Sequence, residues 1–445
     1  MPTPIYYLKA CMRLEKIITL KKITVLSIWL LALCLNLTAQ ENSPYSRYGL
    51  GDMVPQGNII TRAMGGLSAP YFDYQSVNYL NPATYSKLRV TTFDLGFEVD
   101  NRTIREPNNP GKFSSRSANI SYVQLGIPIM PKRNWGINFG LRPVTRINYK
   151  IQSNRRLTDI DSSATIFEGS GGSYEVFAGT GIAFGKLNVG LNFGYLFGTK
   201  DYSSKQILLN DSVAYYKANF QNKSTFGGLA LSGGAQYSIQ LAKTTFLRLG
   251  ATGQLKKTFN AKRDRKIESF DYDVNGGTFT IDSAFSETDA KGELNYPGSY
   301  SFGFLIDKEN EWGFGAEFSG ANWSQYRFFG DGDALRNSWQ SKIGGHWTPD
   351  MLRGKSYWSR VTYRAGFFYG KENIKADGDL NILGFTAGAA FPVRRNVYTN
   401  QYTVINTAFE FGQRGNNNNL IRENFFRISV GFSLSDLWFV KRKYN

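Results

Sequence analysis

The sequence predicts an all-β fold: a transmembrane antiparallel β-barrel of about 14 strands with an N-terminal hatch or plug. Aromatic residues make up 15% of the chain and glycine is frequent, whereas proline is scarce, a composition typical of β-proteins. From Arg89 onward, apolar side chains alternate with small, polar or charged ones, and the connections alternate between long and short. The slightly negative mean hydropathy argues against an α-helical membrane bundle. It does not argue against a barrel, because only every second strand residue faces lipid.

Residues 1–39 have the features of an export signal. Lysines precede the apolar run Ile23–Leu35, which is too short for a comfortable transmembrane helix. Leu37-Thr38-Ala39 then offers a small-residue cleavage site before Gln40. The sequence therefore predicts export, with a mature chain that begins near Gln40.

Both cysteines, Cys11 and Cys34, lie within this segment, so the exported chain would have none. A lipoprotein signal built on Cys34 is a weaker alternative, because Leu33 is bulky for the position before the cysteine. A barrel closed by its own hydrogen-bond ladder needs no disulfide. Whether translation begins at Met1 or at Met12 stays open.

The formal net charge of +17 comes from basic residues that are scattered along the chain. Nucleic-acid binding would need a basic cluster on one element, so we exclude it. For an exported protein, the anionic partners that fit this charge are outer-membrane lipid and lipopolysaccharide. The expected location is the bacterial outer membrane.

Residues 40–88 predict a hatch or plug. Proline and glycine interrupt the start of this segment, and Arg62–Ser86 is rich in small and turn-forming residues. Short helical turns are expected near Ile59–Met64, and a turn is expected at Asn81 because Pro82 follows it. We expect the segment to fold inside the barrel or across its periplasmic mouth.

Residues 89–434 predict the barrel. In Leu187–Gly198, aromatic and aliphatic residues share one face while asparagine and glycine share the other. Strands of a soluble sandwich alternate as well, so the even strand count and the loop lengths decide for a barrel. The stretches are 89–100, 115–128, 134–150, 172–184, 187–201, 222–240, 244–258, 296–307, 311–325, 336–348, 357–371, 380–391, 401–413 and 424–434.

The loop lengths also predict the orientation of the barrel. Short connections such as Gly185-Lys186 are expected in the periplasm, and long ones such as 151–171, 202–221 and 259–295 are expected outside the cell. This topology places both chain ends on the periplasmic side, with residues 435–445 as a periplasmic tail.

Two stretches alternate poorly. In 115–128 the apolar parity switches near Tyr122-Val123, which indicates a β-bulge. In 222–240 the pairs Gly227-Gly228 and Gly233-Gly234 mark either a weak seam in the wall or a place where an inner segment packs closely. We favour close packing.

Charged residues of both signs occupy strand positions that the alternation predicts to face the lumen. In an open lumen they would set selectivity, and in a plugged lumen they would pair with the hatch. The mixture of signs favours pairing. These residues are Asp94, Glu98, Arg142, Arg248, Glu317, Lys342, Arg360, Arg364, Glu410 and Arg427.

The segment Arg62–Ser86, RAMGGLSAPYFDYQSVNYLNPATYS, resembles the opening segment of FadL-type outer-membrane proteins. The matching residues are Arg62, Ala63, Gly65 and Gly66, then the acidic Asp73, then Asn81, Pro82 and Ala83. The tail SDLWFVKRKYN is similar to the ending of FadL-like proteins of Bacteroidota. The resemblance implies a fourteen-stranded barrel with an internal hatch, and it makes Arg62–Gly66 and Asn81–Ala83 the expected hatch residues. The alternative for Asn81-Pro82 is a simple turn.

Catalysis and metal binding are poorly supported. The chain has a single histidine, His346, and no Gly-x-Ser-x-Gly motif that would supply a nucleophilic serine for it. Asp331-Gly332-Asp333 and Asp377-Gly378-Asp379 could bind calcium weakly, but ordinary loop turns explain them. We expect neither enzyme activity nor a cofactor.

Two functions remain. The resemblance implies passage of hydrophobic compounds such as long-chain fatty acids, through a lateral opening in the wall. It also leaves open a non-transporting structural or accessory subunit of an outer-membrane secretion or assembly complex, with outer-membrane protein partners docked on long aromatic loops such as Phe259–Asn295. The sequence does not decide whether the lumen is open or sealed.

Overall fold

The computed structural model describes residues 43–106, 111–156, 162–209, 216–275, 277–351, 356–375, 378–394 and 402–438. The expected signal segment 1–39 and most of the expected tail lie outside these residues. Within them, no helix has the length and apolar character needed to cross a membrane.

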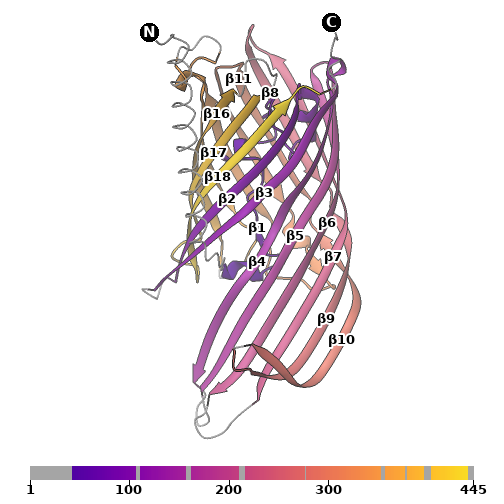
Figure 1. The fold of residues 1–445 in the computed structure, drawn as a ribbon, viewed down its shortest axis with the longest axis vertical. Helices are drawn as coiled ribbons and strands as arrows, with labels where there is room; N and C mark the ends of the chain where they lie inside the picture. The colour runs from indigo at the N-terminus through magenta and orange to yellow at the C-terminus, as the bar shows by residue number, and fades with distance from the viewer. Residues whose placement is uncertain are drawn as a thin grey trace, which may run out of the picture.

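The strands form one antiparallel sheet that closes on itself, because the last strand, β18, pairs with β2 along its whole length (Figure 1). The wall strands are β2 (Thr91–Arg105), β3 (Lys112–Met130), β4 (Trp135–Arg156), β5 (Ser162–Phe184), β6 (Leu187–Leu209), β7 (Lys217–Gln240), β8 (Thr245–Gln254), β9 (Lys257–Tyr272), β10 (Thr278–Tyr296), β11 (Ser299–Lys308), β12 (Trp312–Ala321), β14 (Ser338–Trp347), β15 (Thr362–Lys371), β16 (Asn381–Arg394), β17 (Tyr402–Arg414) and β18 (Arg422–Asp436).

Two of the wall strands are each broken into halves. β8 and β9 are separated at Leu255-Lys256, and β10 and β11 are separated at Pro297-Gly298. β9 pairs with β10, and β8 pairs with β11, so the two breaks lie at the same level of the wall. When β8 and β9 are counted as one strand, and β10 and β11 as another, the wall has 14 strands. This count confirms the predicted fold class. The short strands β1 (Asp52–Met53) and β13 (Arg327–Phe328) attach to longer ones.

The alternation in the sequence follows from the two faces of the wall. In β6, the side chains of Leu191, Phe193 and Tyr195 are exposed on the outer face. Asn192 and Leu196 are buried on the inner face. Outward apolar and inward polar or small residues are what a lipid-facing barrel wall requires.

Half of the wall is much taller than the rest. β6 has 23 residues, so it is about 76 Å long, whereas β12 has 10 residues. The outer parts of β4, β5, β6 and β7, together with β9 and β10, extend beyond their neighbours as a curved sheet (Figure 1). We call this the six-stranded extension. The sequence prediction of long loops over 151–171, 202–221 and 259–295 was therefore wrong, because most of these residues continue the strands as long hairpins.

The wall opens between β3 and β4 over its outer half. β3 pairs with β4 only from Val123–Leu141 to Met130–Trp135, although β4 pairs with β5 as far as Arg156. Each of the two strands has a β-bulge near the start of the gap. Ser121 has no opposite residue in β2, which places a bulge beside the predicted Tyr122-Val123 switch. Val144 is the extra residue of a second bulge, in β4.

The hatch fills this gap. Asp52 and Met53 of β1 pair with Arg146 and Thr145 of β4, and the Val54 amide donates to the Val144 carbonyl at 3.1 Å. The segment thus supplies the hydrogen bonds that β3 does not supply to this edge of β4.

The hatch runs along the whole lumen. Ser43 lies at the outer end, where its amide donates to Asn148 and its hydroxyl to Glu423. The chain then passes through α2 (Ile59–Arg62) and reaches η2 (Pro82–Lys87) at the end of the barrel that carries the short turns, directly before β2. The first described residues therefore lie at the outer end, which corrects the expectation that this segment begins on the periplasmic side. The reason is the open edge of β4, which holds β1 near the outside. At the other end, β18 continues to Asp436, so the strand includes the first two residues of the expected tail.

Candidate functional site

Arg62 lies at the centre of the hatch, between two carboxylates of the wall. Its Nη1 is 2.8 Å from Glu98 Oε2, and its Nε is 2.7 Å from Glu410 Oε1. Helix α2 positions it, and Asn58 caps that helix by accepting a hydrogen bond from the Thr61 amide. All three charged side chains are buried, so each depends on the others for solvation.

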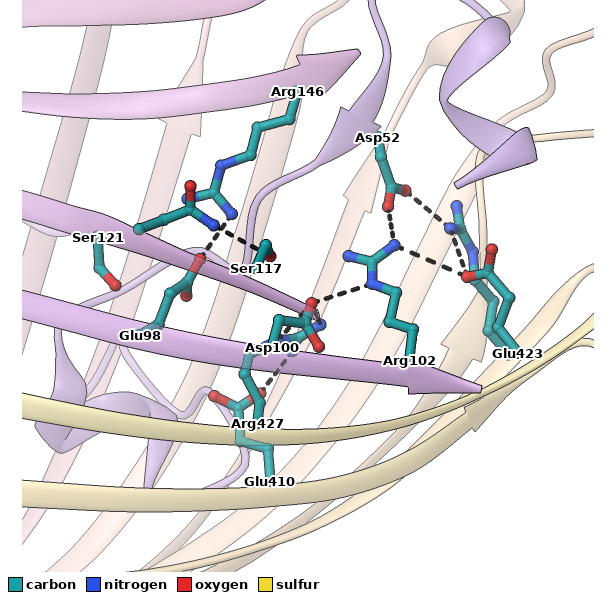
Figure 2. Close-up of polar contacts among 12 residues, drawn as sticks. Asp52, Glu98, Asp100, Arg102, Ser117, Ser121, Arg146, Glu410, Glu423 and Arg427 are labelled. Carbon is teal, nitrogen blue, oxygen red and sulfur yellow. Dashed lines mark hydrogen bonds and ion pairs between the residues drawn. The ribbon is translucent and has the colours of Figure 1, made fainter. Parts of the chain in front are cut away.

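The two carboxylates extend this contact into a network across the wall (Figure 2). Glu98 also pairs with Arg146 of β4 at 2.7 Å, which joins β2 to β4 across the wall gap. Glu410 also pairs with Arg427 of β18 at 2.9 Å, and Arg427 is 3.3 Å from Asp100 of β2. One hatch arginine is thus connected to four wall strands.

A second layer of ion pairs lies nearer the outer end and is centred on Asp52 of the hatch. Asp52 contacts Arg102 of β2 and is 2.7 Å from Arg414 of β17. Glu423 of β18 is 3.4 Å from the same arginine, and Glu372 in the loop after β15 is 3.1 Å from it. Figure 2 shows Asp52, Arg102 and Glu423 facing one another in this layer.

The charges of this layer shift the protonation of its acids. Burial by itself would raise the pKa of Asp52, but Arg414 and Arg102 outweigh burial and hold that pKa well below its usual range. Burial raises the pKa of Glu372, and Asp52 and Glu423 add to the increase against the opposing effect of Arg414. Asp52 is therefore the permanent anion that holds the two arginines.

The wall also grips the backbone of the hatch. The amides of Ser68 and Ala69 both donate to Glu317 Oε2 at 2.7 Å, and Lys342 pairs with the same carboxylate at 3.1 Å. The Gly65 amide donates to Thr386 Oγ1 at 2.8 Å. Since these contacts are to main-chain atoms, they fix the path of the hatch and not only its side chains.

Wall glycines make room for the hatch backbone. A Cβ atom on any of seven inward glycines would lie 2.0–2.3 Å from a hatch atom, closer than real Cβ atoms approach their neighbours. Gly234, one of the four glycines in 222–240, would meet Asn81 Oδ1, so close packing explains this position. We call these seven residues the glycine ring: Gly136, Gly181, Gly190, Gly234, Gly250, Gly344 and Gly366.

Asn81 combines the two roles considered for it. Its Oδ1 accepts from the Ala83 amide and caps η2, which is the turn role. Its Nδ2 donates to the Ala69 carbonyl at 2.6 Å and ties two parts of the hatch together. Pro82 and Ala83 follow in η2, against Gly181 and Gly190 of the wall.

The space left in the outer lumen has a mixed lining. A cavity of about 390 Å³ lies beside the hatch, and its lining combines Arg62, Arg142, Lys342, Arg414 and several wall serines with Tyr79, Tyr296, Trp323, Trp339, Phe368 and Phe425. An apolar ligand there would meet aromatic side chains, but it would also remove the charged groups from water without replacing their hydrogen bonds. The ion pairs and main-chain contacts of the hatch obstruct this part of the lumen.

The remaining inward residues are placed as follows. Asp94 accepts from Ser76 of the hatch, and Arg142 contacts Gln56 of the hatch as well as Glu175. Arg248 pairs with Asp307. Arg364 lies near Asp73 at the periplasmic end.

Arg360 lies apart from the other inward residues. It was expected in the strand 357–371, but it belongs to η5 (Trp358–Arg360) at the periplasmic rim and is exposed, because β15 begins only at Thr362.

Sequence reasoning missed the whole outer layer: Asp52, Arg102, Glu372, Arg414 and Glu423. Arg414 and Glu423 face each other across the β17–β18 hairpin, at positions that the sequence reasoning assigned to a loop or its edge. Among the described residues, no group of three or more histidine, cysteine or acidic side chains is placed to hold a metal ion. Asp333 accepts from the Gly49 amide, and Asp379 pairs with Lys371. Asp377 lies outside the described residues.

Comparisons with known proteins give a family and a fold. A model of the BamG family matches residues 19–445, and no curated protein matches the chain. Among solved structures, the barrels to which the chain is similar include the following three. The toluene transporter TodX of Pseudomonas putida is 16% identical, with 90% of this chain and 100% of that chain covered and a TM-score of 0.54. A FadL homologue of Pseudomonas aeruginosa is 13% identical (86% and 98% covered, TM-score 0.55). The toluene transporter TbuX of Ralstonia pickettii is 15% identical (85% and 98% covered, TM-score 0.52).

At these identities the likeness establishes the fold alone. The FadL-type fold implied by Arg62–Ser86 is therefore confirmed, while the family model that matches is that of BamG.

Proposed function

The chain belongs to the BamG family, and from this premise we propose that it is a sealed outer-membrane barrel that serves as a structural subunit and docks a protein partner at its outer face. The proposal uses the hatch as a permanent closure and the six-stranded extension as the docking element.

The observation that carries the proposal is a row of apolar side chains on the concave face of the extension. Cross-strand pairing aligns Ile151, Phe167, Phe220, Ile267 and Phe285, with Ser204 as the one polar member. The three phenylalanines are 38–46% exposed. The row lies on the same face of the sheet as Tyr202 and Lys200, whose polar atoms contact the hatch. The row therefore faces the space above the barrel mouth.

The opposite face of the same strands lacks such a row. Next to the apolar row, its cross-strand positions carry Lys150, Glu168, Ser203, Gln221, Lys266 and Ser286. A one-sided apolar band of this kind, outside the lipid, is typical of a protein interaction surface. It spans six strands, or about 24 Å.

The contacts that hold the hatch support a docking role over transport. Buried ion pairs and the glycine ring hold the hatch, and the cavity beside it is lined by charged groups as well as by aromatic side chains. A hydrophobic solute would have to displace these contacts.

The test is affinity purification of the tagged protein from membranes in mild detergent. We expect Phe285→Asp with Phe220→Asp to reduce the recovery of co-purifying outer-membrane proteins at least tenfold, because a buried carboxylate would oppose an apolar contact. Ser286→Asp, on the opposite face of β10, is the matched control and should leave recovery unchanged. Recovery of the chain alone from wild-type membranes would count against the proposal.

Passage of hydrophobic compounds is the second candidate, favoured by the wall gap between β3 and β4 and by the fold shared with barrels named as toluene transporters. In this case, the β1 segment would leave the edge of β4 and release a solute sideways. Loss of toluene or fatty-acid uptake in a deletion strain, restored by the wild-type gene, would favour this candidate over docking.

A further inference from the structure

A second cavity lies at the periplasmic mouth, on the far side of the hatch from the apolar row. It has a volume of about 340 Å³ and is bounded by the hatch loop Tyr71–Ser76 and by β8, β11, β14, β15, β16, β17 and β18. Neither the sealing of the lumen nor the docking surface involves it. Its lining includes three arginines and the single histidine: Arg248, Arg360, Arg364 and His346.

Among the buried arginines that the structure describes in the lumen, Arg364 lies farthest from a carboxylate. Its side chain is 3% exposed, yet the nearest carboxylate oxygen, on Asp73, is 3.9 Å from Nη2. Its Nε has no hydrogen-bond partner within the part of the chain that the structure describes. By contrast, Arg62, Arg414 and Arg427 each have a carboxylate oxygen within 2.9 Å.

The neighbours of Arg364 leave room for an anion. His346 of β14 is its cross-strand neighbour. The Nε2 atom of His346 is 3.3 Å from Asp307, while its buried Nδ1 has no partner within the described residues. The Tyr71 hydroxyl is a hydrogen-bond partner of Arg364, but the Nε–H of this buried guanidinium still costs free energy unless an anion or water accepts from it. The adjoining cavity is the place from which such a group can reach it.

The chemistry of the site favours a carboxylate over a phosphate. A planar guanidinium binds a carboxylate through two parallel hydrogen bonds. Asp73, Asp307 and Glu309 also line the cavity, and they would repel a dianionic phosphate more strongly than a monoanion.

A neighbouring acceptor indicates what the carboxylate is attached to. Asp307 is paired with Arg248 and Asp73 accepts from the Gln75 amide, but the buried Asn406 Oδ1 has no partner within the described residues. An acyl chain would leave this acceptor unsatisfied, whereas a peptide N–H group would pair with it. Tyr71, Phe72 and Tyr402 provide aromatic surface for a side chain.

We propose that the periplasmic cavity binds the C-terminal carboxylate of a peptide, with Arg364 as the group that holds it. This inference is independent of the docking role of the extension. It would give the barrel a second contact, on its periplasmic side.

Binding to the full-length protein in detergent tests the proposal by calorimetry with acetyl-Ala-Ala-Phe as the probe. We expect the free acid to bind at least tenfold more tightly than the C-terminal amide, since the amide loses a charge-assisted hydrogen bond. This comparison uses the wild-type chain, so it does not depend on the folding of a variant. Equal binding of acid and amide, or binding of neither, would overturn the proposal.

Variants and competing ligands identify the residue and the ligand class. Arg364→Gln should abolish the preference for the acid, whereas Arg89→Gln, an exposed arginine bonded to Asn134 at the rim, should keep it. Retention of the preference in Arg364→Gln would contradict the assigned role. Tighter binding of octanoate than of the peptide would assign the cavity to acyl ligands instead, and displacement of the peptide by millimolar inorganic phosphate would overturn the carboxylate assignment.

Discussion

The replacement Arg62→Met is expected to loosen the hatch and to make a non-conducting barrel conduct ions. Without Arg62, the buried Glu98 keeps Arg146 as its ion-pair partner, and the buried Glu410 keeps Arg427. Breaking a buried ion pair by removing one partner costs about 3–5 kcal/mol. We therefore expect a lower thermal unfolding midpoint, together with ion-conducting events in planar lipid bilayers.

Two further variants make this result specific. Arg116→Met removes an exposed arginine of β3 that bonds to Asn101, and it should leave both midpoint and conductance unchanged. Arg62→Lys keeps the charge but cannot reach both carboxylates with a planar fork, so an intermediate effect is expected. An Arg62→Met protein that conducts no ions and keeps the wild-type unfolding midpoint would show that the central ion pairs do not hold the hatch.

The glycine ring gives the second large effect. Gly344 and Gly366 are cross-strand neighbours in β14 and β15, and a Cβ on them would lie 2.1 Å from the Met64 carbonyl oxygen and 2.2 Å from the Gly65 amide nitrogen. Because both clashes are with backbone, the hatch has to move. Overpacking of this kind costs roughly 1–3 kcal/mol per site. The double variant Gly344→Ala with Gly366→Ala should therefore make residues 62–66 accessible to proteases in the folded barrel.

The control for this variant is Gly253→Ala. A Cβ on Gly253 would meet only the Ser299 carbonyl oxygen, at 3.8 Å, which is ordinary contact. This variant should stay protected to the same degree as the wild type. Equal protection of the double glycine variant would mean that the hatch is not held against β14 and β15 as described.

Part of the fold could be predicted because its cause is local. Because one face of each strand meets lipid and the other meets the hatch, apolar residues recur at every second position. Stretches such as Leu187–Gly198 can therefore be recognised as strands from the sequence. The bulge at Ser121 changes that parity and leaves a mark in the sequence. Gly234 is also visible, since a strand interior rarely has glycine without a close neighbour.

Other features depend on partners far away in the chain. The extension was taken for loops because its strands alternate apolar Phe167 and Phe220 with polar residues on a surface that faces no lipid, so the pattern is weak. Asp52 and Glu423 are 371 positions apart, and only the closed sheet brings both to Arg414. The position of Ser43 at the outer end follows from the gap between β3 and β4, which no local pattern reveals.

The ion pairs and the glycine ring together imply that the barrel is closed because the hatch is built into its wall. The docking role depends on this closure, whereas passage of hydrophobic compounds requires that the hatch can yield. Conductance of the native protein therefore tests the closure itself, whereas uptake of hydrophobic compounds in a deletion strain separates the two functions.

The most direct measurement is the single-channel conductance of the wild-type protein in planar bilayers, compared with a variant lacking residues 43–88. The account predicts no steady current through the wild type and large, stable steps through the deletion variant. A steady open conductance of the wild-type protein, equal to that of the deletion variant, would contradict a hatch-sealed barrel.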